Sequence, residues 1–176
     1  MNEKNIDVLR LGHRFVRDDR TVTHLCLVSR ALGAQMIVLE EVDSELKNTV
    51  DEVNKTWGGD FRVIESSWGK VVEAAKKEGR VVVHLTMYGM PLQEKIEELR
   101  KQKNLLVVIG GPKVPGDIYK LADFNISITT QPHSEVAALA IFLHEIQSGE
   151  ELKKEFREHK LKIIPREKGK QVELKS

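Results

Sequence analysis

The sequence has little cysteine, few aromatic residues and no long apolar run. Among 176 residues there is one cysteine, and aromatic residues make up 5%. The single cysteine, Cys26, excludes an intramolecular disulfide framework and a zinc site built from thiolates. No apolar stretch approaches the roughly 20 residues that span a bilayer, and residues 1–10 lack the apolar core of a signal peptide. The sequence therefore predicts a cytoplasmic protein with no membrane partner.

Motifs that carry several common chemistries are also absent. There is no GxxxxGK[ST], which excludes a P-loop nucleoside triphosphatase, and no GxGxxG after the first predicted strand, which argues against a classical dinucleotide or Rossmann-type methyltransferase site. No GxSxG nucleophile elbow occurs, and the six histidines lack metal-ligand spacing. Cys26 stands in an apolar helical stretch and is predicted to be buried. The residues therefore imply neither a metal site nor a covalent nucleophile.

Apolar runs of strand length alternate with helical patterns along most of the chain. This alternation predicts an α/β fold, in which helices cover both faces of a mostly parallel sheet. Runs such as VVVHL and LLVVI are continuous, as expected for strands buried on both faces. The predicted strands are 6–11, 36–39, 61–64, 81–85, 105–109 and 125–129. The predicted helices are 22–32, 44–57, 67–78, 92–102, a short one beginning at Pro115, and 134–147.

The last part of the chain differs in charge from the rest. Residues 1–150 carry 19 Lys and Arg against 22 Asp and Glu, whereas residues 151–176 carry nine against five. We therefore expect one domain over 1–150 and a basic C-terminal extension over 151–176. The stretches KLKII and KQVEL, separated by Pro165–Gly169, predict a β-hairpin in this extension.

Three loops after consecutive predicted strands are rich in glycine, proline and hydroxyl residues. In open α/β sheets, ligands bind outside the carboxyl ends of the strands. Glycine lets a backbone approach a ligand closely and proline stiffens the loop, so such loops suit a flat ligand held by backbone groups. The three loops are TMYGMP (86–91), GGPKVP (110–115) and TTQPHS (129–134).

A basic loop follows the first predicted strand. The stretch GHRFVRDDR places Arg14, Arg17 and Arg20 at spacings of three, with Asp18 and Asp19 between them. Guanidinium groups match phosphate oxygens, but a purely structural pairing with the neighbouring carboxylates is equally compatible with the spacing. The few aromatic residues are too dispersed to stack bases, so RNA binding would rest on charge and loops.

Three segments resemble a known family. VLRLGHRFVRDDRTVTHLCLVSRALGA (8–34), VVHLTMYG (82–89) and LVVIGGPKVPGDIYKLADFNISITTQPHSEVAALAIFL (106–143) are similar to the archaeal tRNA (cytidine(56)-2'-O)-methyltransferases of the SPOUT superfamily. The resemblance covers nearly the whole chain. It implies transfer of a methyl group from S-adenosyl-L-methionine to the ribose 2'-hydroxyl of cytidine 56 in the T loop of tRNA. It also implies a C-terminal trefoil knot and a homodimer.

The resemblance further implies residue roles. Arg20 is expected to be catalytic, with Arg14 and Arg17 on phosphates and Ser134 at the start of the last helix. A guanidinium is a poor base, so we expect Arg20 to fix the ribose and its phosphate while a phosphate oxygen or water accepts the proton. The implied cofactor residues are Leu85, Gly110, Gly111, Pro112, Lys113, Val114, Ile128, Thr129, Thr130, Gln131, Pro132, His133, Ser134 and Glu135.

The sequence departs from other ribose methylases of the superfamily at two positions. Leu27 stands where a helix arginine would fall, and Ser134 stands where an asparagine would fall. Three alternatives stay open: methylation of a base nitrogen or another RNA position, an inactive RNA-binding homologue, and a flavodoxin-like nucleotide-binding regulator. The last one predicts phosphate-binding glycines or an acidic pocket, which GHRFVRDDR does not supply. The hairpin either adds phosphate contacts to tRNA or serves as a dimer clasp or solvated tail.

Overall fold

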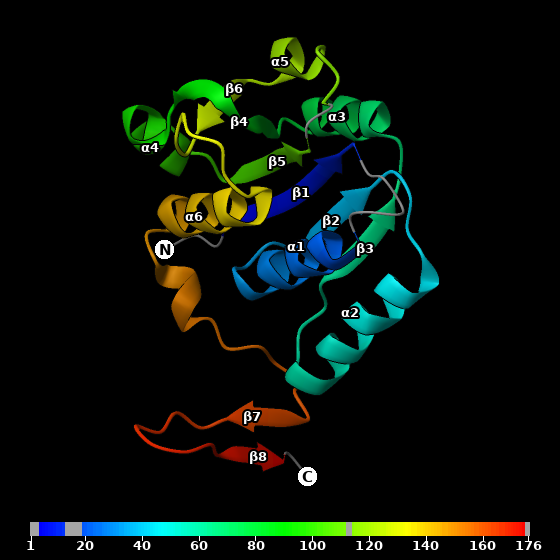
Figure 1. Ribbon diagram of the computed structural model, residues 1–176, viewed down its shortest axis with the longest axis vertical. Coiled ribbons are helices and arrows are strands. Elements are labelled where there is room, and N and C mark those ends of the chain that lie inside the picture. Colours follow the sequence, from blue (N-terminus) through cyan, green and yellow to red (C-terminus); the bar gives the residue numbers. More distant parts are fainter. Residues whose placement is uncertain (1–3, 13–18, 112–113, 175–176) are drawn as a thin grey trace.

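The computed structural model describes residues 4–12, 19–111 and 114–174, in which strands and helices alternate as predicted (Figure 1). A separate two-stranded hairpin lies near the C-terminal end, beyond α2 in the view of Figure 1. The elements are β1 (Asn5–Leu11), α1 (Asp19–Ala31), β2 (Met36–Leu39), α2 (Ser44–Trp57), β3 (Arg62–Glu65), α3 (Trp68–Lys77), β4 (Val81–Pro91), α4 (Leu92–Arg100), β5 (Asn104–Gly110), α5 (Ile118–Leu121), β6 (Phe124–Ser127), α6 (Glu135–Gln147), the 3-10 helix η1 (Glu150–Lys153), β7 (Leu161–Ile163) and β8 (Val172–Leu174).

The main sheet has the order β3-β2-β1-β5-β4-β6. All its neighbouring strands are parallel, which confirms the predicted sheet type. The order reverses between β1 and β5, because β2 and β3 extend the sheet on one side of β1, while β4 and β6 extend it on the other. Ligand sites of open α/β sheets form at such a reversal, outside the carboxyl ends of the strands.

Helices cover both faces of the sheet, as predicted. Alternate residues of each strand point to opposite faces, and they fall into two apolar clusters. On one face, Ile6 and Val8 of β1 pack with residues of α1, α2, α4 and α6. On the other face, Leu9 and Leu11 of β1 pack with residues of α3 and α5. Because both faces are buried, the central strands read as continuous apolar runs rather than as alternating ones.

Strand β4 is longer than predicted. The sequence predicts a strand over 81–85 followed by a loop, but β4 continues to Pro91 and stays next to β6. Its register against β6 shifts between Leu85 and Met90. A Cβ atom on Gly89 would lie 2.5 Å from the carbonyl carbon and oxygen of Asn125, so only glycine lets the two backbones come this close. The expected loop 86–91 is therefore an irregular part of a strand.

The segment after α6 is attached to the body by a few local contacts. The guanidinium of Arg30 lies 4.5 Å from the ring centroid of Phe156, a distance typical of a cation-π contact. The Gly59 amide donates to the carbonyl of Arg157 at 3.0 Å. β7 and β8 pair antiparallel beyond these contacts, so a hairpin is present where the sequence predicts one. Within the described ranges, no helix has both the length and the apolar character needed to cross a membrane.

Candidate cofactor and active site

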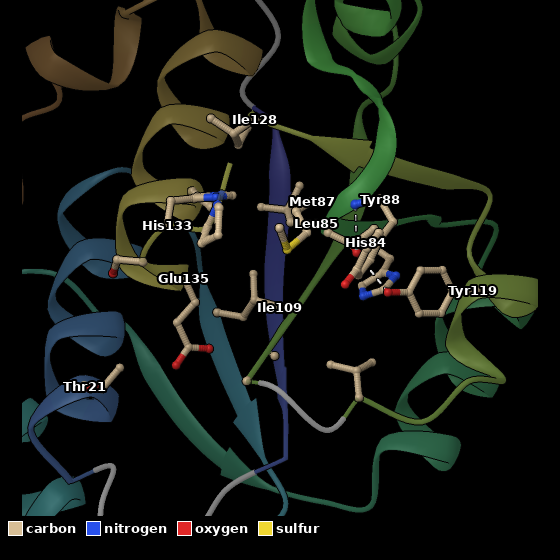
Figure 2. A pocket seen from close by; sticks show the side chains of 17 residues that line it. Thr21, His84, Leu85, Met87, Tyr88, Ile109, Tyr119, Ile128, His133 and Glu135 are labelled. Carbon is tan, nitrogen blue, oxygen red and sulfur yellow. Dashed lines mark hydrogen bonds between the residues drawn. The ribbon is translucent and has the colours of Figure 1, made fainter. Parts of the chain in front are cut away.

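A cavity of about 640 Å³ lies at the carboxyl ends of β4 and β5, beside the start of α6 (Figure 2). Its volume falls within the roughly 300–1,000 Å³ that small-molecule sites occupy. Residues of all three predicted loops reach it, together with one residue of α1. The described lining consists of Thr21, His84, Leu85, Thr86, Met87, Tyr88, Ile109, Gly110, Gly111, Val114, Tyr119, Ile128, Pro132, His133, Ser134, Glu135 and Ala138.

Gly110 forms the end of β5 at the cavity. A Cβ atom built on Gly110 would lie 2.4 Å from Cγ2 of Val114 and 3.3 Å from the carbonyl oxygen of Leu11. The first distance is far below a normal van der Waals contact, so a larger residue would displace Val114 from its place in the lining. Gly110 therefore offers the cavity backbone atoms alone, which is the property that the glycine-rich loop predicts.

A hydrogen-bonded network stands behind the β4 side of the cavity. The ring Nδ1 of His84 lies 2.9 Å from Oδ1 of Asn125, whose amide nitrogen donates to the carbonyl of Tyr119. The hydroxyls of Tyr119 and Thr86 are 2.9 Å apart, and the Tyr119 ring meets His84 edge to face. Burial lowers the pKa of His84, so the imidazole is neutral and donates its Nδ1 proton to Asn125. The network fixes this wall without a charge.

Ser134 caps α6 at the edge of the cavity. Its hydroxyl accepts a hydrogen bond from the amide of Val136 at 3.2 Å, which confirms the capping role predicted for it. The loop before it is held locally, since Thr129 accepts from the Gln131 amide and His133 contacts the Gln131 carbonyl. The remaining amides of the first turn lie beside the cavity, where a helix N-terminus favours electronegative ligand groups.

A buried ion pair joins the first strand to the start of the last helix. Arg10 of β1, whose side chain is 1% exposed, donates from Nη2 to Oε1 of Glu135 at 2.9 Å. Its Nε lies 3.3 and 3.4 Å from the two carboxylate oxygens. The sequence analysis does not single out this pair, because it predicts Arg10 only as part of an apolar strand over 6–11. The signal that could have found it is a charged residue inside a strand predicted to be buried on both faces.

The cavity brings together most of the predicted cofactor residues. Leu85, Gly110, Gly111, Val114, Ile128, Pro132, His133, Ser134 and Glu135 line it. Thr129, Thr130 and Gln131 belong to the same loop, but they are not among the lining residues. Pro112 and Lys113 lie outside the described residues. The sequence did not single out Thr21, Ile109, Tyr119 or Ala138, and it predicted His84 as a core residue, which its burial confirms.

Arg20 does not line this cavity, although its neighbour Thr21 does. Arg20 is exposed and lines another cavity, of about 310 Å³, together with His24, Asp43 and Glu45. Arg14 and Arg17 lie outside the described residues. In this single chain the predicted catalytic arginine and the predicted cofactor residues therefore do not line the same cavity.

Cys26 is buried, as predicted, and burial raises its pKa to about 12. A thiol with such a pKa stays protonated at neutral pH and is a poor nucleophile. Among the residues that the structure describes, no group of three or more His, Cys, Asp and Glu side chains is placed to hold a metal ion.

Comparison with known proteins identifies the family of this chain. The family described as "tRNA ribose 2'-O-methyltransferase, aTrm56" matches residues 57–173. The tRNA (cytidine(56)-2'-O)-methyltransferase of Nitrosopumilus maritimus is 50% identical over 171 residues, which cover 97% of each chain. This chain belongs to that family. The resemblance of the three segments is thereby confirmed for the chain as a whole.

Solved structures of methyltransferases share the fold of this aTrm56 family member. An RNA 2'-O ribose methyltransferase matches with a TM-score of 0.64 at 14% identity, over 85% of this chain. The SpoU methyltransferase AviRb of Streptomyces viridochromogenes, crystallised in complex with AdoMet, matches with a TM-score of 0.57 at 15% identity, over 84% of this chain. The chain spans 58% of the length of each of these two proteins, and at such low identity the likeness concerns the fold.

Proposed function

We propose that this protein transfers a methyl group from S-adenosyl-L-methionine to the ribose 2'-hydroxyl of cytidine 56 of tRNA. The main supporting observation is that the irregular part of β4, the end of β5 and the loop before α6 contribute to one cavity, in a chain that belongs to the tRNA ribose 2'-O-methyltransferase family. The relative from Nitrosopumilus maritimus, at 50% identity, is named for methylation of cytidine 56.

The residues around the cavity fit this cofactor. Its volume suits a nucleoside with an amino acid side arm, and Leu85, Ile109 and Ile128 supply apolar walls for a base. Gly110 leaves backbone groups available, and the first turn of α6 adds amides. These are the features by which a neutral adenine ring and a ribose are held without a dedicated charge. Glu135 adds the one carboxylate of the described lining.

Bound S-adenosyl-L-methionine supplies a methyl group that its sulfonium has already activated. The protein then has to orient the 2'-hydroxyl and provide a route for its proton. We assign the orientation to Arg20, whose guanidinium matches the phosphate next to the ribose, with Arg14 and Arg17 on further phosphates. Because a guanidinium stays protonated, a phosphate oxygen or a water molecule accepts the proton.

We propose that the active site is completed by a second copy of the chain. Arg20 is exposed and does not line the cofactor cavity of its own chain, so a homodimer that places Arg20 against the partner's cavity would bring it to a bound cofactor. Mixed dimers test this. A chain carrying Arg20→Ala, mixed with a chain carrying Gly110→Val, should regain activity, whereas neither variant should be active alone. No recovery after verified mixing would contradict a shared site.

Three finer assignments complete the proposal. The chain leaves β6 at the edge of the sheet and returns to its middle, where α6 contacts α1 and α4, a path that suits the trefoil knot expected of the superfamily. A crystal structure traced through residues 105–147 tests the knot.

Residues 151–176 form a basic extension to the domain over 1–150. Deleting that extension tests whether it adds phosphate contacts, through the salt dependence of tRNA binding. A tRNA substrate places the enzyme in the cytoplasm.

The activity is tested with unmodified tRNA transcript and labelled S-adenosyl-L-methionine. We expect incorporation at cytidine 56 and resistance of the following phosphodiester to alkali, since a 2'-O-methyl group blocks alkaline cleavage. Arg20→Ala should abolish incorporation while cofactor affinity is kept. A label that leaves the backbone sensitive to alkali would indicate methylation of a base instead. Tight binding of cofactor and tRNA without any incorporation would indicate an inactive RNA-binding protein.

A further inference from the structure

Glu135 is the one carboxylate among the described residues that line the cavity. It is the first residue of α6, and its side chain points toward Ile109 and Thr21, at the side of the cavity nearest the N-terminal end of α1 (Figure 2). Glu135 therefore lies where α6, β5 and α1 meet at the cavity.

Arg10 holds this carboxylate in place. Its Nη2 lies 2.9 Å from Oε1 of Glu135, and its Nε lies 3.3 Å from the same oxygen. The guanidinium is 1% exposed and the carboxylate 16% exposed, so the pair sits at the boundary between the core and the cavity. Two nitrogens of the buried guanidinium therefore hold the carboxylate in one position. A carboxylate fixed at the edge of the cavity can attract a cation that binds there.

The cofactor carries such a cation at its reacting atom. In the proposed reaction the bond between sulfur and methyl carbon breaks, the bond between that carbon and the ribose 2'-oxygen forms, and the electron pair stays on sulfur. The sulfonium becomes a neutral thioether, and the hydroxyl proton leaves to a phosphate oxygen or water. A carboxylate beside the sulfur therefore attracts the substrate form of the cofactor and loses that attraction when the product forms.

We propose that Arg10 is a positioning residue that holds the carboxylate of Glu135 toward the sulfonium, so that the cavity distinguishes S-adenosyl-L-methionine from its neutral product. This inference rests on the proposed function, because it needs the cofactor in this cavity. It assigns a role to Arg10, and it gives Glu135 a defined partner atom within the cofactor.

The first test compares three ligands by titration calorimetry on the full-length protein. They are S-adenosyl-L-methionine, S-adenosylhomocysteine, whose sulfur is neutral, and sinefungin, in which an amine-bearing carbon replaces the sulfonium. Glu135→Gln should weaken binding of the two cationic ligands about tenfold, as expected for losing one close charge pair in a partly buried site, and change S-adenosylhomocysteine by less than about threefold. Equal weakening of all three ligands would place Glu135 at their shared ammonium group and overturn the proposal. So would no change in any of them.

The second test addresses Arg10. Arg10→Met should reduce the preference for S-adenosyl-L-methionine over S-adenosylhomocysteine as Glu135→Gln does, because the carboxylate is no longer held, and Arg10→Lys should restore part of that preference. The double variant Arg10→Met with Glu135→Gln should lose no more preference than Glu135→Gln alone. If the double variant loses as much ligand preference as the two single variants combined, Arg10 acts independently of Glu135. If Arg10→Met does not fold, Glu135→Gln decides alone, since glutamine still offers Arg10 an acceptor oxygen.

Matched controls exist on the same helix. Glu145 pairs with Arg100 at the other end of α6, away from the cavity. Glu145→Gln and Arg100→Met make the same changes of charge and should leave the ligand preference unchanged. If the unaltered protein binds S-adenosyl-L-methionine and Gly110→Val does not weaken it, the cofactor lies elsewhere and the proposed function's site fails. If Gly110→Val does weaken it but Glu135→Gln keeps the preference, the inference alone fails.

Discussion

Helix α6 has an ion pair at each of its two ends, and the pairs differ in what surrounds them. At the N-terminal end, Arg10 is buried under the cavity and holds Glu135. At the C-terminal end, Arg100 is 31% exposed and its Nη2 lies 3.4 Å from Glu145, while its Nη1 also contacts Glu97. The first pair can influence a ligand, because few water molecules screen it. The second is screened on the surface and adds little.

The C-terminal end of α6 instead attaches the C-terminal segment and the end of α1 to the domain. His144 contacts Oε1 of Glu151 at 2.7 Å, and Glu151 is buried in η1. Gln147 donates to the carbonyl of Leu32 at the end of α1. The helix therefore connects the cavity at one end to the C-terminal segment at the other. Substitutions at the N-terminal end should therefore change both function and stability, whereas substitutions at the C-terminal end should change stability alone or nothing.

The largest expected effect is on Arg10. Arg10→Ala leaves the carboxylate of Glu135 without its buried partner and creates a void, so the free energy of unfolding should fall by about 3–5 kcal/mol. Arg100→Ala at the other end should lower it by less than about 1 kcal/mol. Urea denaturation of both variants measures the difference. Equal losses would show that burial does not distinguish the two pairs.

The next effect is on the helix cap. Ser134→Ala removes the acceptor for the Val136 amide and should cost about 1 kcal/mol of stability. Because Ser134 itself lines the cavity, the affinity for S-adenosyl-L-methionine should fall as well. Ser134→Asp keeps an acceptor and should retain the stability. Stability and affinity are measured on the same samples, and an Ala variant with unchanged stability would rule out the capping role.

A smaller effect is expected at Glu151. One of its carboxylate oxygens is buried without a partner among the described residues, so the charge is poorly compensated there. Glu151→Met should change the free energy of unfolding by less than about 1 kcal/mol, because the lost hydrogen bond is offset by the removed desolvation cost. Methyl transfer should be unaffected. A loss of several kcal/mol would indicate that His144 and Glu151 hold the C-terminal segment more firmly than the surface pair does.

The smallest effect concerns Ser148, which ends α6 with a φ of 56°. Non-glycine residues adopt this left-handed conformation at a cost, so Ser148→Gly should raise the free energy of unfolding by about 0.5 kcal/mol. An upward shift of the thermal midpoint by about 1–2 °C, with unchanged activity, checks it. A lowered midpoint would mean that the hydroxyl of Ser148 matters more than its backbone.

Most of the fold follows from local patterns that the sequence displays. The predicted ranges for β2 and α2 match the structure residue for residue, because continuous apolar runs and glycine-terminated amphipathic stretches are strong local signals. The strand order could not be derived in this way, since pairing depends on contacts between distant segments. For the same reason, the extension of β4 to Pro91 was missed. It depends on the close approach of Gly89 to Asn125, which has no local signature.

The candidate site was predictable to a similar extent. Loop composition and the strand-end rule located Gly110, Gly111 and the 132–134 stretch, and the family resemblance added Glu135. The residues that contact this site from distant parts of the chain could not be predicted from local sequence. Arg10 meets Glu135 across 125 residues, and Tyr119 meets Thr86 through a hydroxyl contact that no spacing reveals. The position of Arg20 relative to a second copy of the chain stays a prediction.

The clamp between Arg10 and Glu135 also has a consequence for the lifetime of the enzyme. It joins the first strand of the sheet to the last long helix, so the chain can complete it only when nearly all of the domain has been made and packed. A ligand that binds only the completed cavity shifts the folding equilibrium by an amount set by its concentration relative to its dissociation constant. Starvation for methyl donor should then expose the unoccupied protein to proteolysis, and the abundance of the enzyme should follow the supply of its own cofactor.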